Sequence, residues 1–257
     1  MKIYTYYQKI ETRHLKPDNQ SELIDLWKIS WSRQGYEPIV LNLQDAKNHT
    51  YFKTLNTEMR RIFKEITGKA ISDYGMSCWF RWLAYATQRE EKFYVSDYDA
   101  ININFPTKEP EDQLHLMDFA CPFLASGTPR QFEQLCKLFI EISDQRIKIL
   151  KEQVSHYHDQ EFFQYNFMPQ YNDSAIDLRN EHGFLMTRNR HELGGGMDPL
   201  ENKILADPYT GYIPNENRKV FHVSHANIRI LQKKYTQYKN QDSSKLRIDL
   251  VKKLLGI

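Results

Sequence analysis

Short apolar runs and longer amphipathic segments alternate along the first half of the chain. Residues 2–7 and 38–43 have the composition of buried strands. The segment between them has apolar positions at helical spacing, from Ser21, a suitable N-cap, to a stop at Gly35. A strand, a helix and a second strand in this order predict a βαβ unit, whose strands pair in parallel with helices packed over the sheet.

The alternation continues to an apolar run that ends in two aspartates. Helices are expected at residues 55–66 and 74–87, and the next strand, residues 93–101, carries Asp97 and Asp99. In open α/β sheets, ligands bind beyond the carboxyl ends of the strands. Two carboxylates there can share a hard divalent cation, Mg²⁺ or Mn²⁺, whose other ligands are phosphate oxygens and water. The competing interpretation is an ordinary solvated turn.

The second half of the chain has a looser pattern. The triple glycine at residues 194–196 predicts a loop, because glycines lose much conformational entropy in regular structure. His222 and His225 end a late apolar run, and on one continuous strand they would point to opposite faces. The expected elements are strands at residues 114–124 and 219–224, and helices at 128–151, 159–165 and 243–255.

Composition and charge fit one large α/β domain. Of 257 residues, 40% are hydrophobic and 13% aromatic, and the sequence has neither an internal repeat nor a long linker. Residues 227–257 carry eight Lys and Arg against two Asp. This basic helical segment is either a solvated face or a contact for an anionic membrane surface. Basic residues nowhere line one face densely enough for DNA or RNA, so no nucleic-acid partner is expected.

Cysteine content and the N-terminal residues predict a cytoplasmic protein. Cys78, Cys121 and Cys136 are odd in number and lack metal-type spacing, which indicates reduced, buried thiols. Residues 1–7 contain no apolar leader, and no run is long enough to span a bilayer. Peripheral membrane contact through the basic helix is the alternative to a purely cytoplasmic location.

Three further segments accompany the aspartate pair. Residues 72–83, SDYGMSCWFRWL, precede the strand FYVSDYD at 93–99; residues 219–225, KVFHVSH, form a late strand with a histidine; and residues 156–163, HYHDQEFF, place Asp-Gln at a helix start. Together they resemble GT-A-fold glycosyltransferases with an Asp-X-Asp motif, which have a mainly parallel, Rossmann-like sheet flanked by helices. The glycine pair common before that motif is replaced by residues 87–92, TQREEK, so no sugar specificity carries over.

The resemblance implies metal ligands and a catalytic group. Asp97, Asp99 and His222, with His225 in reserve, would hold Mn²⁺ or Mg²⁺, and Asp99 would be the stronger of the two aspartate ligands. Asp97 would also reach the donor. Asp159 would deprotonate the acceptor hydroxyl or stabilise an oxocarbenium-like transition state, and its structural alternative is a helix N-cap.

The same resemblance implies a binding site for a nucleotide-sugar. Thr5, Tyr7 and Asp45 occupy positions where the fold holds the base and ribose. Asp73 and Arg81 pair either with one another or with phosphate and sugar oxygens. Secondary candidates for catalysis or sugar contact are Glu161, Asp198, Ser126 and Gly127.

These expectations define a function. A divalent cation stabilises the negative charge that develops on a departing diphosphate. We therefore expect a metal-dependent glycosyltransferase that moves a sugar from a nucleoside diphosphate, UDP above all, to a hydroxyl of a glycan or lipid-linked acceptor. The alternatives are a non-catalytic glycan- or nucleotide-binding protein and a sugar-phosphate nucleotidyltransferase. The latter is disfavoured because residues 6–9 lack a glycine-rich basic loop.

A single domain, residues 1–257, would accommodate this function. Residues 1–105 would form its nucleotide-sugar-binding half, residues 106–225 the acceptor-binding half with the late metal-ligand strand, and residues 226–257 the basic helical tail.

Overall fold

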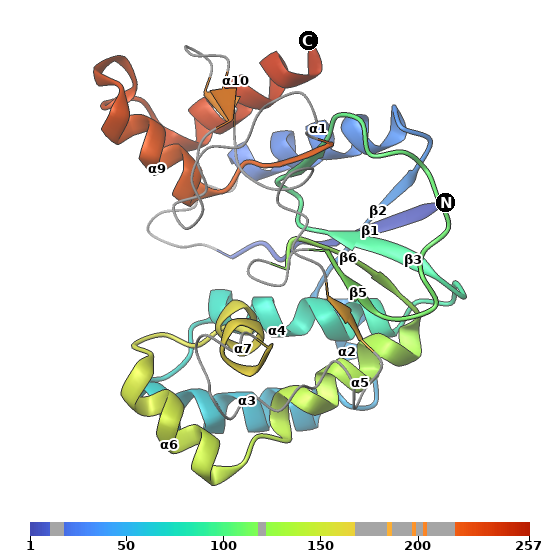
Figure 1. Ribbon diagram of the computed structural model, residues 1–257, viewed down its shortest axis with the longest axis vertical. Helices are drawn as coiled ribbons and strands as arrows, with labels where there is room; N and C mark the ends of the chain where they lie inside the picture. The colour runs from blue at the N-terminus through green and yellow to red at the C-terminus, as the bar shows by residue number, and fades with distance from the viewer. Residues whose placement is uncertain (11–17, 118–121, 168–183, 187–196, 199–202, 205–218) are drawn as a thin grey trace.

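The computed structural model describes residues 1–10, 18–117, 122–167, 184–186, 197–198, 203–204 and 219–257 (Figure 1). Its centre is a six-stranded sheet in the order β2-β1-β3-β6-β5-β7. Strand β1 pairs in parallel with both β2 and β3, whereas β6 is antiparallel to β3 and to β5. The predicted α/β class with a mainly parallel sheet is confirmed. The strands are β1 (Lys2–Tyr6), β2 (Glu37–Leu41), β3 (Phe93–Ser96), β5 (His115–Leu116), β6 (Leu124–Gly127) and β7 (Leu185–Met186).

Helices cover both faces of this sheet, and each face has its own apolar core (Figure 1). One core contains Trp27 and Trp31 of helix α1, and the other contains Trp79 and Trp82 of helix α4. The N-terminal unit β1-α1-β2 is therefore the predicted βαβ unit. The helices of this part are α1 (Asp18–Ser32), α2 (Leu43–Lys47), α3 (Phe52–Thr67), α4 (Asp73–Ala86), α5 (Pro129–Ile140), α6 (Asp144–Gln153) and α7 (Asp159–Phe167).

Two smaller sheets follow from pairing between distant segments. Strand β4 (Ala100–Asn102) pairs antiparallel with β10 (Val220–His222), and His222 lies opposite Ala100. Strands β8 (Met197–Asp198) and β9 (Lys203–Ile204) form the other small sheet. The first of these sheets matters for function, because it brings the late histidine beside the aspartate pair.

Several predicted boundaries differ from the structure. The helix expected at residues 128–151 is two helices, α5 and α6, because Ser143 caps a new helix start by accepting a hydrogen bond from the Arg146 backbone N–H at 3.2 Å. Ser21 is not an N-cap, since α1 begins at Asp18. The segment expected as strand at 114–124 is only partly strand, in β5 and the first residue of β6. Residues 194–196 and Cys121 lie outside the described residues.

The C-terminal segment is helical, as expected, and packs onto the domain. Helices α9 (His225–Lys234) and α10 (Ser243–Leu255) flank a short 3-10 turn, and α10 packs against α1 (Figure 1). Two lysines of α10 form ion pairs: Lys245 with Asp249 at an N–O distance of 2.7 Å, and Lys252 with Glu22 at 2.6 Å. Contact of this helix with a membrane stays a prediction.

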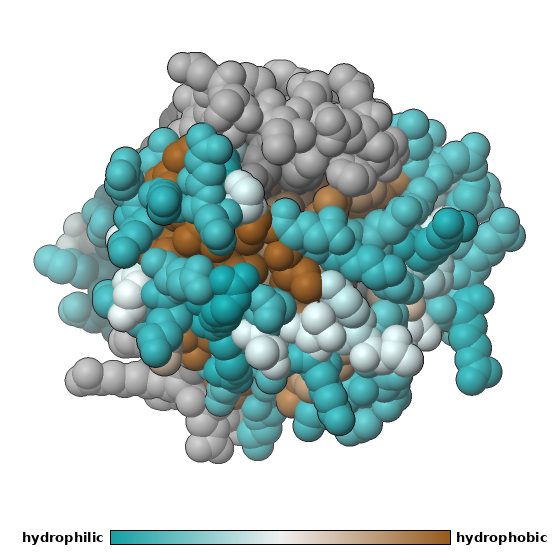
Figure 2. All heavy atoms as spheres, turned by 90° about the horizontal axis from the view of Figure 1, so that it is seen from below, coloured by the Kyte–Doolittle hydropathy of each residue, from teal (hydrophilic) through white to brown (hydrophobic). Residues whose placement is uncertain are grey.

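The visible surface is predominantly polar. Seen from below, polar residues cover much of the described part of this face, and a group of apolar residues lies between them near its centre (Figure 2). Among the described residues, the exposed large apolar side chains are Ile29, Tyr74 and Ile257. No helix in the described part of the chain has the length and hydropathy to cross a bilayer.

Candidate functional site

The aspartate pair lies in a turn at the carboxyl end of β3. The turn is closed by a hydrogen bond from the Ala100 backbone N–H to the Asp97 carbonyl at 3.0 Å. Helix α1 holds it on both sides, because the indole N–H of Trp27 donates to the Ser96 hydroxyl and that of Trp31 donates to the Ala100 carbonyl, each at 2.9 Å. The sequence correctly placed the two carboxylates at the carboxyl end of a fully buried strand.

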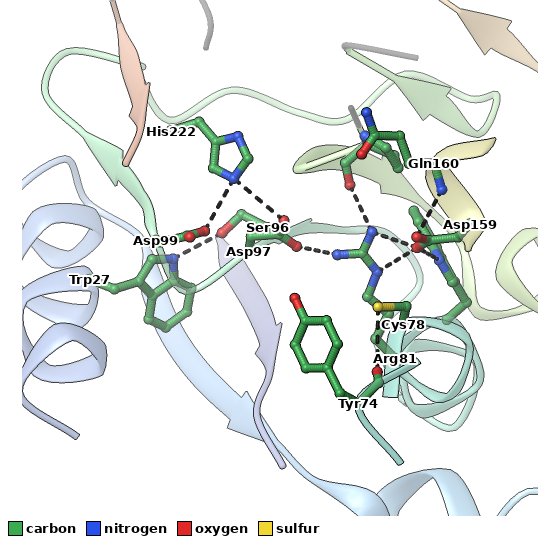
Figure 3. A network of polar contacts seen from close by, with 12 residues as sticks. Trp27, Tyr74, Cys78, Arg81, Ser96, Asp97, Asp99, Asp159, Gln160 and His222 are labelled. Atoms are coloured by element: carbon green, nitrogen blue, oxygen red, sulfur yellow. Dashed lines mark hydrogen bonds and ion pairs between the residues drawn. The ribbon is translucent and has the colours of Figure 1, made fainter. Parts of the chain in front are cut away.

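His222 joins the aspartates through the β4–β10 pairing. The Val223 backbone N–H donates to the Asp99 carbonyl at 2.8 Å, so β10 is fixed alongside the turn. His222 Nε2 then lies 3.3 Å from Asp99 Oδ1 and 3.8 Å from Asp97 Oδ2 (Figure 3). The imidazole ring stacks on Phe123 at a centroid distance of 4.7 Å.

This cluster has the donor set of a divalent metal site. One ligand atom from each of Asp97, Asp99 and His222 can be chosen so that all three lie within 4.8 Å of one another. Two carboxylate oxygens and an imidazole nitrogen suit Mn²⁺, and the carboxylates also suit Mg²⁺. His225 does not join the cluster, because β10 ends at His222 and His225 begins helix α9.

Arg81 connects the cluster to helix α7. Its Nη1 contacts Asp97 Oδ1, and its Nε and Nη2 both donate to Asp159 Oδ2, at 2.9 and 2.6 Å (Figure 3). Burial alone would lower the pKa of Arg81, but the carboxylates of Asp159 and Asp97 raise it well above its ordinary value. Arg81 is therefore a permanent cation between two carboxylates.

Asp159 has a full set of hydrogen-bond donors around it. Besides Arg81, the indole N–H of Trp82 donates to its Oδ2 at 2.8 Å, and the Gln160 backbone N–H donates to its Oδ1 at 2.9 Å. Its side chain is 5% exposed. These contacts place Asp159 as the anchor of Arg81, and its role as a general base stays a prediction that this geometry does not favour.

Arg247 of α10 approaches the cluster from the opposite side. Its Nη2 donates to Asp99 Oδ2 at 2.6 Å, its Nε donates to the Val223 carbonyl at 2.9 Å, and its Nη1 lies 2.8 Å from His225 Nε2. The sequence interpretation missed this residue. A signal was present, because Arg247 lies three and four positions before Leu250 and Val251 and so shares their apolar helix face.

Each aspartate thus gives one oxygen to an arginine and turns the other toward His222. Burial raises the pKa of Asp97, and Arg81 opposes that shift. Burial also acts against ionisation of Asp99, but His222 and Arg247 together hold the pKa of Asp99 well below its ordinary value. Burial and the neighbouring Arg247 lower the pKa of His225 to about 4. His225 is therefore neutral near pH 7 and can accept a hydrogen bond from Arg247.

Two of the residues predicted to bind the nucleotide lie on or just after β1. Thr5 is fully buried, and its Oγ1 has no hydrogen-bond partner among the described residues, so its hydroxyl does not face an open site. Tyr7 is half-buried, with its ring 5.7 Å from that of Tyr98. Tyr7 and Tyr98 line a small pocket together with Gln20 and Tyr74, next to the aspartate turn.

Asp45 and Asp73 lie elsewhere. The Asp45 carboxylate accepts a hydrogen bond from the Asn42 backbone N–H at 2.7 Å, and Asp45 lines a hollow that contains none of the cluster residues. Asp73 is 76% exposed and lies 3.8 Å from Arg60. Of the two alternatives for Asp73 and Arg81, pairing with one another is wrong, because Arg81 is held by Asp97 and Asp159.

Three of the four secondary candidates, Ser126, Gly127 and Glu161, are separate from the cluster. Ser126 and Gly127 end β6, but β6 runs antiparallel to β3, so its start and not its end lies beside Asp97. Glu161 accepts a hydrogen bond from the His158 backbone N–H at 2.7 Å, within the start of α7. Asp198 belongs to β8, whose side chains are outside the description.

Comparisons with known proteins add little to this picture. A family model described as a domain of unknown function (DUF8765) matches residues 1–90, which precede the aspartate pair. A comparison with curated proteins gives no match. Among solved structures, the chain is similar to the apo form of the glycosyltransferase GlyE of Streptococcus pneumoniae TIGR4, with 14% identity and a TM-score of 0.33. The match covers 96% of this chain and 62% of that one, so this chain spans less than two thirds of GlyE. A structural likeness at that TM-score says nothing about the function of this chain. The function is therefore inferred from the geometry of the site.

Proposed function

We propose that this protein is a metal-dependent glycosyltransferase that uses a nucleoside diphosphate sugar. The observation that supports this proposal is the convergence of Asp97, Asp99 and His222 at the carboxyl end of a parallel strand. In α/β sheets this edge is where nucleotide ligands bind. A divalent cation held there would stabilise the charge on the diphosphate leaving group.

The charges around the cluster suit a diphosphate together with a cation. Three carboxylates lie with two guanidinium groups at this site, namely Asp97, Asp99 and Asp159 with Arg81 and Arg247. When all are ionised, their sum is one negative charge. A dication reverses this sign, and the positive site that results attracts the two phosphates of a nucleotide. We therefore expect the cation to bind more tightly when the nucleotide is present.

The pocket beside the turn supports a nucleobase as the other end of the donor. Tyr7, Tyr74 and Tyr98 line this pocket, so a base that entered it would meet their aromatic side chains. Gln20 is 3% exposed, and its Oε1 has no hydrogen-bond donor among the described residues. Because this oxygen is buried in the same way as Thr5 Oγ1, the Gln20 side chain has to turn into the pocket before it could accept a hydrogen bond from an imide N–H such as that of uracil. We therefore propose a UDP-sugar as the donor. The acceptor proposed, a glycan or lipid-linked hydroxyl, rests on the resemblance of the sequence alone.

Release of nucleoside diphosphate from a panel of nucleotide-sugars tests the proposal. Wild-type protein should release it from one donor with Mn²⁺ or Mg²⁺ and stop when a chelator is added. Asp99→Asn should lose at least about 100-fold in rate, because it removes a charged ligand at the centre of the site. Asp249→Asn, an exposed aspartate on α10, is the matched control and should keep full activity. Metal-independent release, or full activity of Asp99→Asn, would contradict the proposal.

A non-catalytic nucleotide-binding protein is the second candidate. It is favoured by the contacts of Asp159, whose two oxygens are already occupied by donors, which leaves the predicted general base without a free oxygen. Such a protein would gain thermal stability from UDP and Mn²⁺ together and would release nothing from any donor in the panel.

A further inference from the structure

We propose that Arg247 is a positioning residue for the metal site, through which the C-terminal helix α10 sets the orientation of Asp99. The inference rests on the proposed function, because it assigns Arg247 to the same cation site. Arg247 holds Asp99 Oδ2 at 2.6 Å, and the other carboxylate oxygen is left facing His222 at 3.3 Å. Asp99 therefore has one oriented oxygen to offer a cation.

The burial of Arg247 indicates that it does more than pack. Its side chain is 1% exposed and lies among the apolar residues of α10, where Leu246 and Leu250 are also buried. A buried guanidinium costs free energy that an apolar side chain of similar size would avoid, unless the charge is well paired. Its charged partner is Asp99, and its two remaining contacts, the Val223 carbonyl and His225, fix the plane of the guanidinium.

Helices α1 and α10 then support the aspartate turn together. Helix α1 holds the turn backbone through Trp31, and α10 packs on α1 and holds the Asp99 side chain through Arg247. Groups that orient metal ligands in this way commonly contribute about 10- to 100-fold to metal affinity. Arg247 is thus a support for the site and need not touch the substrate.

Arg247→Lys is the variant that tests this role, because it keeps the positive charge and loses the planar fork. Mn²⁺ affinity is measured by electron paramagnetic resonance of the free ion, with and without UDP. We expect Arg247→Lys to bind Mn²⁺ about tenfold more weakly than wild type. Arg229→Lys, the same substitution at an exposed position of α9, is the control and should bind as wild type does. An unchanged Mn²⁺ affinity in Arg247→Lys overturns the inference.

The same substitution in an Asp99→Asn background separates positioning from general packing. If Arg247 acts through Asp99, Arg247→Lys should change Mn²⁺ affinity by less than about twofold there, because interacting residues are not additive. An equal loss in both backgrounds overturns the inference. If Arg247→Lys does not fold, His225→Ala takes its place, because it removes one contact of the guanidinium. His225→Ala should weaken Mn²⁺ binding measurably. An unchanged Mn²⁺ affinity in this variant overturns the inference. A wild-type protein that binds no Mn²⁺ would contradict the proposed function itself.

Discussion

The two arginine–aspartate pairs of the site differ in how they are completed. Arg81 lies between Asp97 and Asp159, so it keeps a counter-charge when either carboxylate is removed. Arg247 has Asp99 as its charged partner, and its other contacts are a carbonyl and the neutral ring of His225. The two arginines therefore differ in how far their charge compensation depends on a single aspartate. Asp99 supports both the proposed cation and a buried arginine, whereas Asp97 shares its arginine with another carboxylate.

The largest effect on stability is expected at the anchor of the Arg81 pair. Asp159→Ala removes a buried carboxylate that accepts from Arg81 and from the Trp82 indole. We expect the free energy of unfolding to fall by about 3 kcal/mol, because two donor atoms of Arg81 and the Trp82 indole N–H are left buried without their acceptor, even though Arg81 keeps Asp97 as a counter-charge. Urea unfolding measures this, and Asp73→Ala, at an exposed aspartate of α4, should change it by less than about 0.5 kcal/mol. Equal effects of the two variants would show that Arg81 does not need its anchor.

The next prediction tests the asymmetry of the two pairs directly. Asp99→Asn should lower the free energy of unfolding by about 2 kcal/mol, since Arg247 then has no charged partner among the described residues, and Asp97→Asn by only about 1 kcal/mol, since Arg81 keeps Asp159. Both measurements belong in metal-free buffer, so that cation binding does not contribute. A larger loss for Asp97→Asn than for Asp99→Asn would reverse the comparison.

A third prediction concerns the pocket that neither arginine lines. Gln20→Leu should weaken UDP binding about tenfold in calorimetric titration, because it removes the buried acceptor proposed for the base. Mn²⁺ affinity in the absence of nucleotide should not change. Gln237→Leu, on the exposed turn before α10, is the matched control. If Gln20→Leu weakens metal binding as well, the base pocket and the cation cluster are not separate.

The smallest effect is a pH dependence, to which each arginine's neighbouring histidine contributes. His158 lies next to Asp159, and its pKa is lowered to about 4 by burial and by the neighbouring His156. The pKa of His225 is also lowered to about 4, by burial and by Arg247. In the unfolded chain each histidine has an ordinary pKa near 6.5, so as the pH falls the unfolded chain binds a proton before the folded chain does. The contribution of these two histidines to the free energy of unfolding is therefore fully present above about pH 6.5, and it is lost as the pH drops toward about 4.

Unfolding experiments across this pH window measure that loss. His158→Gln and His225→Gln should each reduce the slope of unfolding free energy against pH, and the double variant should reduce it further. If the slope is the same in the double variant as in wild type, neither histidine is held neutral by the fold.

The aspartate turn could be predicted because its signals are local. An apolar run marks β3, and Asp97 and Asp99 directly follow it, so neighbouring residues were enough. Pairing across the chain was harder to predict. Ser126 and Gly127 were assigned to the wrong end of the sheet because the direction of β6 depends on its partner strands. The break between α5 and α6 was missed because the periodic apolar pattern continues past the Ser143 cap.

Side-chain roles were predictable only where the partner was close in sequence. Arg81 could be associated with the site because it lies on the helix that directly precedes the strand of the aspartates. Its pairing with Asp159, however, depends on how α7 packs. Arg247 is a clearer case, since a charged residue on an apolar helix face indicates a buried partner without naming it. That partner, Asp99, became evident only when α10 was placed beside α1.

The pairing of Arg247 with Asp99 also has a consequence for the order of biosynthesis. The two residues are 148 positions apart, so this contact closes one of the longest loops in the fold. Contacts of high sequence separation form late, after the local units they join. When β1, α1 and β3 have been synthesised, His222 and Arg247 have not, so the site cannot yet be completed. Maturation of the site should coincide with the docking of α10, and a nascent chain stopped before Arg247 would carry an Asp99 without its cationic partner.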